Sequence, residues 1–326
     1  MAPMGTDHAA GHRLTSHGLY TDIRGDAAAP ALLFLHGGPG QGCHDFMVLQ
    51  GDLLAASVRL IGLDQRGVDR SVPLPGDAPL AIADLVEDCE AVRKELGIER
   101  WAVLGQSFGG SLALRYAAAH PAAVSAVAFE NPVWDLAATA RAALPRVALM
   151  LTERGRQDAA LTALTAADRE TSARALRSAY VAALEALAED REVFFVPNPA
   201  TRARLAEIRA AHERPDGAAG DEGSMRHHLA ITADDGAYEP LLGLLPRLAA
   251  PALLITGGYD PLTSPGQRDA FRRAATDHRL LEVAGAGHFV HADEPLQYAS
   301  AVSEFVRACA GDLSGTGTGR VPATGS

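Results

Sequence analysis

The chain has 326 residues, of which 48% are hydrophobic, and a formal net charge of −11. Its length suits one large α/β domain with an insertion, or two domains. The acidic balance argues against nucleic acid or an anionic membrane as a partner, because neither offers cations to a negative surface. The sequence does not indicate a partner protein.

The two ends of the chain and its cysteines exclude further classes. The start lacks a basic segment followed by an apolar one, and no apolar run is long enough to cross a bilayer, so a cytoplasmic location is expected. Residues 1–18 are expected to be flexible, and residues 311–326, rich in Gly, Ser and Thr, to form a disordered tail. The three cysteines lack C-x-x-C spacing, which favours packed, reduced thiols over a metal or redox site: Cys43, Cys89 and Cys309.

In chain order, the first part alternates strand-like and helix-like segments. Residues 31–38 and 58–67 are apolar runs that end in turn residues, and residues 82–98 carry apolar side chains at helical spacing. A short apolar run at 101–104 is followed by an Ala- and Leu-rich helical segment at 111–120. This alternation predicts a mostly parallel, doubly wound sheet with helices on both faces.

The pattern changes in the middle of the chain. Residues 133–250 are rich in Ala, Leu, Arg and Glu, show few strand signals and are predicted to be helical. The α/β alternation returns at residue 251. We therefore expect a core formed by residues 19–132 and 251–310, with residues 133–250 inserted between strands as a helical cap.

The stretch G-Q-S-F-G at residues 105–109 matches the pattern G-x-S-x-G, with a strand expected before it and a helix after it. In that context a sharp turn exposes the serine hydroxyl at the end of the strand. A serine hydroxyl becomes a nucleophile only when a base takes its proton and an acid orients the base. Ser107 therefore needs two partners further along the chain.

The returning α/β part offers both partners. Asp260 follows one apolar strand, and His288 follows the Gly-Ala-Gly turn after the next strand. His291 is a second candidate for the base, but His288 follows the glycine turn directly and is preferred. Ser107, Asp260 and His288 stand in α/β-hydrolase order, each at the carboxyl end of a strand, where open α/β sheets build their sites.

The oxyanion formed during acyl transfer also needs fixed hydrogen-bond donors. We expect one donor to be the backbone N–H of Phe108, directly after the nucleophile. The other is expected in the loop H-G-G-P-G at residues 36–40, where Gly38 has a free N–H and no side chain to block a substrate. Together these groups form the predicted oxyanion hole.

Three motifs give the chain a resemblance to the proline iminopeptidases, serine peptidases of the α/β-hydrolase superfamily. H-G-G-P-G at 36–40 resembles the family's oxyanion loop, D-Q-R-G-V-D-R-S at 64–71 its D-Q-R-G-x-G-R-S motif, and G-Q-S-F-G-G at 105–110 its nucleophile elbow. The resemblance implies an α/β-hydrolase fold that releases proline or a similar residue from a small or short-peptide substrate, without a cofactor. Asp69 replaces the second glycine of the family's motif, which is tolerable because Asp adopts left-handed conformations readily. Arg66 is expected to hold neighbouring loops through charge-assisted hydrogen bonds.

The cap departs from the family's pattern where the family binds a free amine with acidic residues. Alignment by eye places Glu185 on one acidic position, His228 on the family's histidine, and Arg226 where the family has glutamate. A cation at that place would repel an ammonium group and favour a carboxylate, carbonyl or phosphate. The pair of His227 and His228 lacks an evident third ligand, so no metal site is expected.

The sequence therefore predicts a metal-free serine hydrolase that works through an acyl-enzyme. Two substrate classes stay open. The resemblance implies an aminopeptidase reaction, whereas the cap suggests an esterase, thioesterase, amidase or acyl transferase that acts on a small metabolite. An alternative of another class is a non-hydrolytic lyase or ligand-binding relative; the presence of both nucleophile and base favours the hydrolase.

Overall fold

The computed structural model describes residues 11–76, 78–275 and 277–314. Within these residues, one sheet of eight strands has the order β1-β2-β4-β3-β5-β6-β7-β8. The β1–β2 and β2–β4 pairs are antiparallel, and all pairs from β4 to β8 are parallel. This architecture confirms the predicted mostly parallel sheet. The strands are β1 (Gly11–Leu14), β2 (Tyr20–Arg24), β3 (Ala31–Leu35), β4 (Arg59–Asp64), β5 (Trp101–Gln106), β6 (Val124–Glu130), β7 (Ala252–Gly257) and β8 (His278–Val283).

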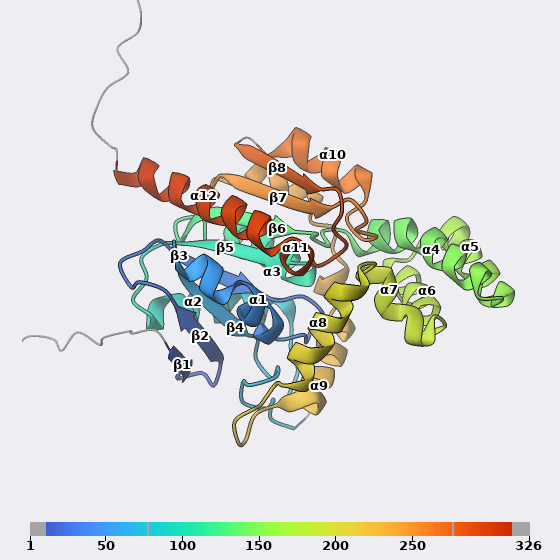
Figure 1. Ribbon diagram of the computed structural model, residues 1–326, viewed down its shortest axis with the longest axis horizontal. Helices are drawn as coiled ribbons and strands as arrows, with labels where there is room; N and C mark the ends of the chain where they lie inside the picture. Colours follow the sequence, from blue (N-terminus) through green and yellow to red (C-terminus); the bar gives the residue numbers. More distant parts are fainter. Residues whose placement is uncertain (1–10, 77, 276, 315–326) are drawn as a thin grey trace, which may run out of the picture.

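Helices cover both faces of the sheet (Figure 1). Every residue of β5 is buried, which explains why this strand reads as a continuous apolar run and not as an alternating one. One face packs against α1 (His44–Ala55) and α12 (Pro295–Ser314), and the short helix α11 (Val290–Asp293) precedes α12. The other face packs against α2 (Ile82–Glu95), α3 (Phe108–Ala119) and α10 (Pro265–Ala274).

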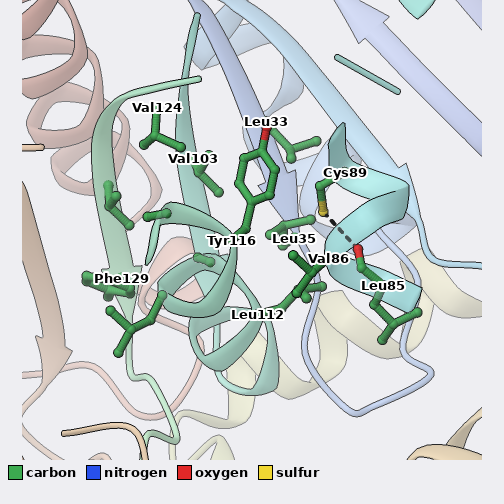
Figure 2. Close-up of a cluster of buried hydrophobic side chains, with 14 of the residues drawn as sticks. Leu33, Leu35, Leu85, Val86, Cys89, Val103, Leu112, Tyr116, Val124 and Phe129 are labelled. Atoms are coloured by element: carbon green, nitrogen blue, oxygen red, sulfur yellow. Dashed lines mark hydrogen bonds between the residues drawn. The ribbon is translucent and has the colours of Figure 1, made fainter. Parts of the chain in front are cut away.

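Figure 2 shows part of the core on the second face. The labelled side chains are buried and come from β3 (Leu33, Leu35), β5 (Val103), β6 (Val124, Phe129), α2 (Leu85, Val86, Cys89) and α3 (Leu112, Tyr116). Burial of each large apolar side chain contributes about 1.5–3 kcal/mol. The Cys89 thiol donates to Leu85 O at 3.2 Å, and burial raises the pKa of this thiol well above its usual value. This packing fixes β5 and α3, the two elements on either side of residue 107.

The segment between β6 and β7 is helical. Asp135 and Ser172 begin two of its helices, because their side chains accept the N–H groups of Ala138 and Ala175. Four helices form an apolar cluster of their own and project to one side of the sheet (Figure 1): α4 (Leu136–Glu153), α5 (Gln157–Arg169), α6 (Ala173–Glu185) and α7 (Arg191–Phe195). The remaining elements are α8 (Pro199–Ala210), α9 (Gly220–Ala233) and the 3-10 helices η1 (Ala188–Asp190), η2 (Asp235–Tyr238) and η3 (Leu242–Arg247).

The predicted limits of core, cap and ends need correction. Leu241, Leu245 and Leu248 pack into the core cluster with α3 and α10, so the last part of the predicted cap 133–250 belongs to the core in its packing. Residues 11–14 of the predicted flexible start form β1, because their backbone pairs with the free edge of β2. Helix α12 extends to residue 314, past the predicted start of the tail at 311. Residues 1–10 and 315–326 lie outside the described residues.

In the part of the chain that the structure describes, no helix combines the length and apolar character needed to cross a membrane. The three cysteines are buried, and none of them forms a disulfide bond in the described structure.

Candidate active site

Ser107 stands at the turn between β5 and α3 with φ 55° and ψ −117°. A positive φ is uncommon for a serine and marks a strained turn. The neighbouring glycines make this turn possible. A Cβ on Gly105 would lie 2.2 Å from Gly109 O, and a Cβ on Gly109 would lie 2.0 Å from Leu35 O. The close approach of α3 to the sheet places Ser107 at the strand end, in the geometry of a nucleophile elbow.

Asp260 and His288 lie in the loops after β7 and β8 and form a buried pair. His288 Nδ1–H donates to Asp260 Oδ1 over 2.7 Å, and the two side chains are 4% and 2% exposed. The carboxylate also accepts the N–H groups of Leu262 and Thr263 at 3.2 and 2.7 Å. These bonds fix the carboxylate and assign the Nδ1 proton, which leaves His288 Nε2 as an acceptor. His288 and Ser107 line the same cavity.

Asn131, the residue after β6, connects the loops that carry Asp260 and His288. Its Nδ2 donates to Gly287 O at 3.1 Å and to His288 O at 2.9 Å, and its Oδ1 accepts Gly257 N–H at 3.1 Å. Asn131 is buried and has φ 41°, a conformation that Asn tolerates better than most residues. The sequence analysis did not identify Asn131. The available signal was the Asn-Pro pair after an apolar run, which is typical of a turn at a strand end.

His291, the second candidate for the base, is bound elsewhere. Its Nδ1–H donates to the Glu130 carboxylate at 2.9 Å, and Tyr298 O–H donates to the same carboxylate at 3.0 Å. The His291 side chain is buried and does not line the cavity over Ser107. This arrangement favours His288 over His291 as the base.

The loop of residues 36–40 passes beside Ser107. A Cβ on Gly37 would lie 3.1 Å from Ser107 Cβ, so the loop has little room for a side chain there. His36 anchors the loop, since its Nδ1–H donates to Gly37 O at 2.9 Å and its Nε2 accepts Gln65 N–H at 3.2 Å. Burial lowers the pKa of His36, which keeps this ring neutral and the two bonds intact.

Gly38 and Phe108 both line the cavity that contains Ser107. Phe108 is the first residue of α3, so its N–H has no acceptor within the helix. Gly38 has φ 112°, a conformation that a residue with a side chain rarely adopts. The two predicted oxyanion donors therefore line the same cavity as Ser107, on backbone that the fold holds in place.

The cavity over Ser107 has a volume of about 270 Å³ and lies between core and cap. We call five of its core residues the floor: Gly38, Pro39, Ser107, Phe108 and His288. We call its residues from α6, α7 and α9 the roof: Arg177, Tyr180, Val181, Leu184, Arg191, Phe195, His228, Ile231 and Thr232. The floor carries the predicted chemistry, and the roof faces it across the space for a substrate.

This fold and motif arrangement occurs in known proteins. Residues 30–295 match the family model described as alpha/beta hydrolase fold. The chain belongs to the alpha/beta hydrolase fold family.

A proline iminopeptidase of Xylella fastidiosa is 43% identical to this alpha/beta hydrolase chain over 106 residues. The match covers 32% of this chain and 33% of the relative, so it spans about a third of that protein. Proline iminopeptidase from Mycobacterium smegmatis has a similar structure, with a TM-score of 0.67, 22% identity and coverage of 94% of this chain and 99% of the other. The enol-lactonase from Burkholderia xenovorans has a TM-score of 0.63 at 20% identity, with coverage of 91% and 100%. The structural likeness shows the fold; the family and the sequence relatives support a hydrolase.

The three predicted cap residues of this alpha/beta hydrolase lie in different places. His228 lines the roof, and its Nδ1–H donates to Pro39 O at 3.1 Å. Glu185, the last residue of α6, is exposed and does not line the cavity. Arg226 lines a separate hollow beside α2 and donates to Leu74 O at 3.2 Å. The predicted cation at the amine site is therefore not Arg226, because residues two positions apart on a helix point about 200° apart and His228 occupies the cavity side.

The motif at residues 64–71 forms the loop after β4, and its charges hold neighbouring elements. Arg66 Nε donates to Asp88 Oδ2 of α2 at 2.7 Å, which agrees with the predicted scaffold role. Arg70 and Asp64 form a buried pair at 2.7 Å, and Asp64 also accepts Cys43 N–H at 2.7 Å. Burial by itself would raise the pKa of Asp64, but Arg70 and the hydrogen bonds hold it below the usual value.

Asp69 joins the core to the cap. It adopts φ 49°, the left-handed conformation predicted for this position. Its carboxylate accepts His212 Nε2–H at 2.9 Å and Arg214 Nε–H at 2.5 Å, and its carbonyl accepts Gly220 N–H at 2.8 Å. The two side-chain partners lie 143 and 145 positions away in the chain, so no local pattern signals these bonds.

His227 is a second contact between cap and core. Its Nδ1–H donates to Arg66 O at 2.9 Å, and burial lowers its pKa to about 4. It therefore does not form a cavity-facing pair with His228. Across the described residues, no group of three or more His, Cys, Asp and Glu side chains is arranged to hold a metal ion.

Proposed function

We propose that the protein is a serine hydrolase that acts through an acyl-enzyme on an ester or amide of a small substrate. The observation that carries the proposal is the buried 2.7 Å bond between His288 Nδ1 and Asp260, with His288 and the strained Ser107 lining one cavity. A serine, a histidine and a carboxylate in this arrangement are the groups that acyl transfer needs. The cavity volume of about 270 Å³ suits a small molecule or a short peptide.

In the proposed mechanism, Ser107 Oγ attacks the substrate carbonyl while His288 Nε2 takes the hydroxyl proton. Asp260 stabilises the imidazolium that forms and keeps the ring oriented. When the tetrahedral intermediate collapses, His288 gives the proton to the leaving group and an acyl-enzyme remains. A water molecule then attacks with His288 as base, and the proton returns to Ser107 as the acid is released.

The oxyanion formed in both steps is proposed to accept hydrogen bonds from the N–H groups of Gly38 and Phe108. Both groups belong to backbone rather than to flexible side chains, so little reorganisation is needed when charge develops. The bonds of His36 to Gly37 and Gln65 support this role by fixing the Gly38 loop.

Release of an N-terminal proline is the reaction that the sequence relatives suggest, and we propose that it is not the preferred reaction. A free amine calls for a carboxylate in the cavity. Glu185 is exposed outside the cavity, and Glu239, which does line it, is paired with Arg115 at 3.2 Å. We propose a cytoplasmic enzyme that cleaves an ester, thioester or amide without a free amine.

A fluorophosphonate probe tests the nucleophile. We expect the wild type to be labelled at Ser107, and Ser107→Ala to lose both labelling and turnover, with kcat reduced at least about 10⁴-fold. Ser111→Ala is the matched control, because Ser111 lines the same cavity but its hydroxyl donates to Val133 O. Labelling that persists in Ser107→Ala and disappears in Ser111→Ala would reject the proposal.

A further inference from the structure

Helix α6 presents one face to the cavity. Its residues Arg177, Tyr180, Val181 and Leu184 all line the roof. These positions are three, four and seven residues apart, which is the spacing of one helix face. The face is apolar at its C-terminal half and carries two polar side chains at the other half.

Arg177 brings a cation into this cavity without a balancing anion. Its side chain is half-buried, and no carboxylate lies within ion-pair distance of it among the described residues. Among the described residues, the Arg177 side chain makes one hydrogen bond, which Nη2 donates to His228 Nε2 at 3.1 Å. A guanidinium has five N–H donors in a fixed fork, so most of its donors remain available to a bound group.

His228 holds Arg177 in place. Its Nδ1–H donates to Pro39 O at 3.1 Å, so Nε2 must be the acceptor for Arg177. Burial lowers the pKa of His228, and the charges of Arg177 and Arg191 lower it further. The ring is therefore neutral, and it links the guanidinium to the loop that carries Gly38.

The charges that line the cavity are unbalanced. They comprise the arginines 115, 177 and 191 and one acidic residue, Glu239, within the described chain. Arg115 already pairs with that glutamate at 3.2 Å and donates to Gly236 O. The cavity lining thus carries an excess of positive charge, opposite in sign to the net charge of −11 of the whole chain.

Tyr180, one turn further along α6 than Arg177, adds an unused donor to the cavity lining. Its hydroxyl is buried and has no hydrogen-bond partner in the described structure. Burial, with a contribution from Asp260, raises the pKa of Tyr180, so the hydroxyl keeps its proton. A phenol hydroxyl without a protein partner is free to donate to an acceptor oxygen of a bound molecule.

We propose that Arg177 and Tyr180 bind a carboxylate of the substrate, so that the enzyme prefers anionic esters or amides. The inference rests on the proposed hydrolase function and names its substrate class. Guanidinium and phenol donors match the acceptor oxygens of a carboxylate, whereas an ammonium group would meet only donors and like charge. Pairs of substrates that differ in whether this carboxylate is free or a methyl ester test the proposal.

The first pair is 4-nitrophenyl hydrogen glutarate and 4-nitrophenyl methyl glutarate, which differ on the acyl side. The second pair is 4-acetoxybenzoate and methyl 4-acetoxybenzoate, which differ on the leaving-group side. In at least one pair we expect wild-type kcat/KM for phenol release to be about ten- to a hundredfold higher for the anion. The pair that shows the preference identifies the side on which Arg177 binds.

In that pair, Arg177→Met should lower the anion preference about ten- to a hundredfold, and Arg177→Lys should retain part of it because a point charge remains without the fork. Tyr180→Phe should lower the preference by about two- to tenfold. Arg174→Met is the matched control and should keep the wild-type preference, since Arg174 lies on the same helix but is exposed and pairs with Asp235. The proposal is overturned if the wild type prefers the methyl esters in both pairs, or if Arg177→Met keeps the wild-type preference.

Binding without turnover separates this inference from the proposed function. In Ser107→Ala, calorimetry with N-(4-nitrophenyl)glutaramic acid and its methyl ester should show tighter binding of the acid, and the difference should disappear in Ser107→Ala/Arg177→Met. Hydrolysis of all four esters without a charge preference would reject the carboxylate site and retain the hydrolase. Charge-selective binding in a protein that hydrolyses none of them and resists fluorophosphonate would reject the hydrolase and retain the carboxylate site.

Discussion

The floor and the roof of the cavity follow different structural rules. The floor residues follow the carboxyl ends of strands β3, β5 and β8. Beside Ser107 the backbone is closely packed, since a Cβ on Gly105 or Gly109 would lie only 2.2 or 2.0 Å from a backbone oxygen. The roof residues lie on cap helices and contact the cavity through their side chains. Among them, Arg177 is half-buried and Arg191 is exposed. Backbone packed this closely allows few alternatives, whereas a helix face accepts many side chains. Substitutions in the roof can therefore change the substrate specificity of one fold while the chemical groups of the floor stay the same.

The contacts between core and cap belong to neither region alone. Asp69 binds His212 and Arg214, and His227 donates to Arg66 O. None of these residues lines the cavity over Ser107. Substitutions of these residues should weaken the attachment of the cap to the core and leave the floor residues unchanged. The predictions below compare these three regions, from the largest expected effect to the smallest.

The side chains of Asp260 and Asp69 are both buried and each binds a histidine, so substituting one or the other compares the catalytic groups with the contact between core and cap. Asp260→Asn should lower kcat about 10³- to 10⁴-fold, because the amide no longer assigns the His288 tautomer or stabilises its cation. Asp69→Asn should keep kcat within about threefold and lower the free energy of unfolding by about 1–3 kcal/mol, since a charge-assisted bond is weakened. Steady-state kinetics and urea denaturation measure the two effects. Equal losses of kcat in the two variants would show that the distinction is wrong.

Acidification should loosen the contact between core and cap. Burial lowers the pKa of His227 from 6.5 to about 4, so between these values the unfolded chain binds more protons than the folded one. The free energy of unfolding should therefore fall as pH decreases from about 6.5 to 4, by up to about 3 kcal/mol from this residue. Burial lowers the pKa values of His36, His44 and His228 as well, which adds to the effect in the same direction.

Urea denaturation at pH 7.5, 5.5 and 4 measures this dependence. His227→Asn should reduce its slope, and His17→Asn, at an exposed position, should keep the wild-type slope. If both variants show the wild-type slope, His227 does not contribute to the acid sensitivity.

Arg226→Glu should have the smallest effect. Arg226 lines a hollow outside the cavity, so reversing its charge should change the ratio of kcat/KM for prolyl 4-nitroanilide over cyclopentanecarbonyl 4-nitroanilide by less than about twofold. The wild type should prefer the cyclopentane compound, which lacks the amine. A tenfold shift toward the prolyl compound in Arg226→Glu would place this residue at the substrate after all, as the alignment of the cap assumed.

Local sequence was sufficient to select the three residues of the candidate catalytic group. An apolar run followed by turn glycines identifies a strand end, and this signal marked Ser107, Asp260 and His288 without knowledge of the third dimension. The resemblance contributed at Asp69, where the family has glycine: Asp was expected to be tolerable there because it adopts left-handed conformations readily, and its φ is 49°.

Tertiary structure decided the choices that local sequence left open. His288 and His291 are three positions apart, and only the buried bond to Glu130 shows that His291 is occupied elsewhere. The sequence indicated that α6 and α9 are helices, but not which face of each meets the cavity. Packing against the core fixes the rotation of a helix about its axis. A rotation of about 100° separates Glu185 from Leu184, and one of about 200° separates Arg226 from His228. For this reason the sequence by itself identified the candidate chemistry, whereas the choice of Arg177 and Tyr180 as substrate contacts required the folded chain.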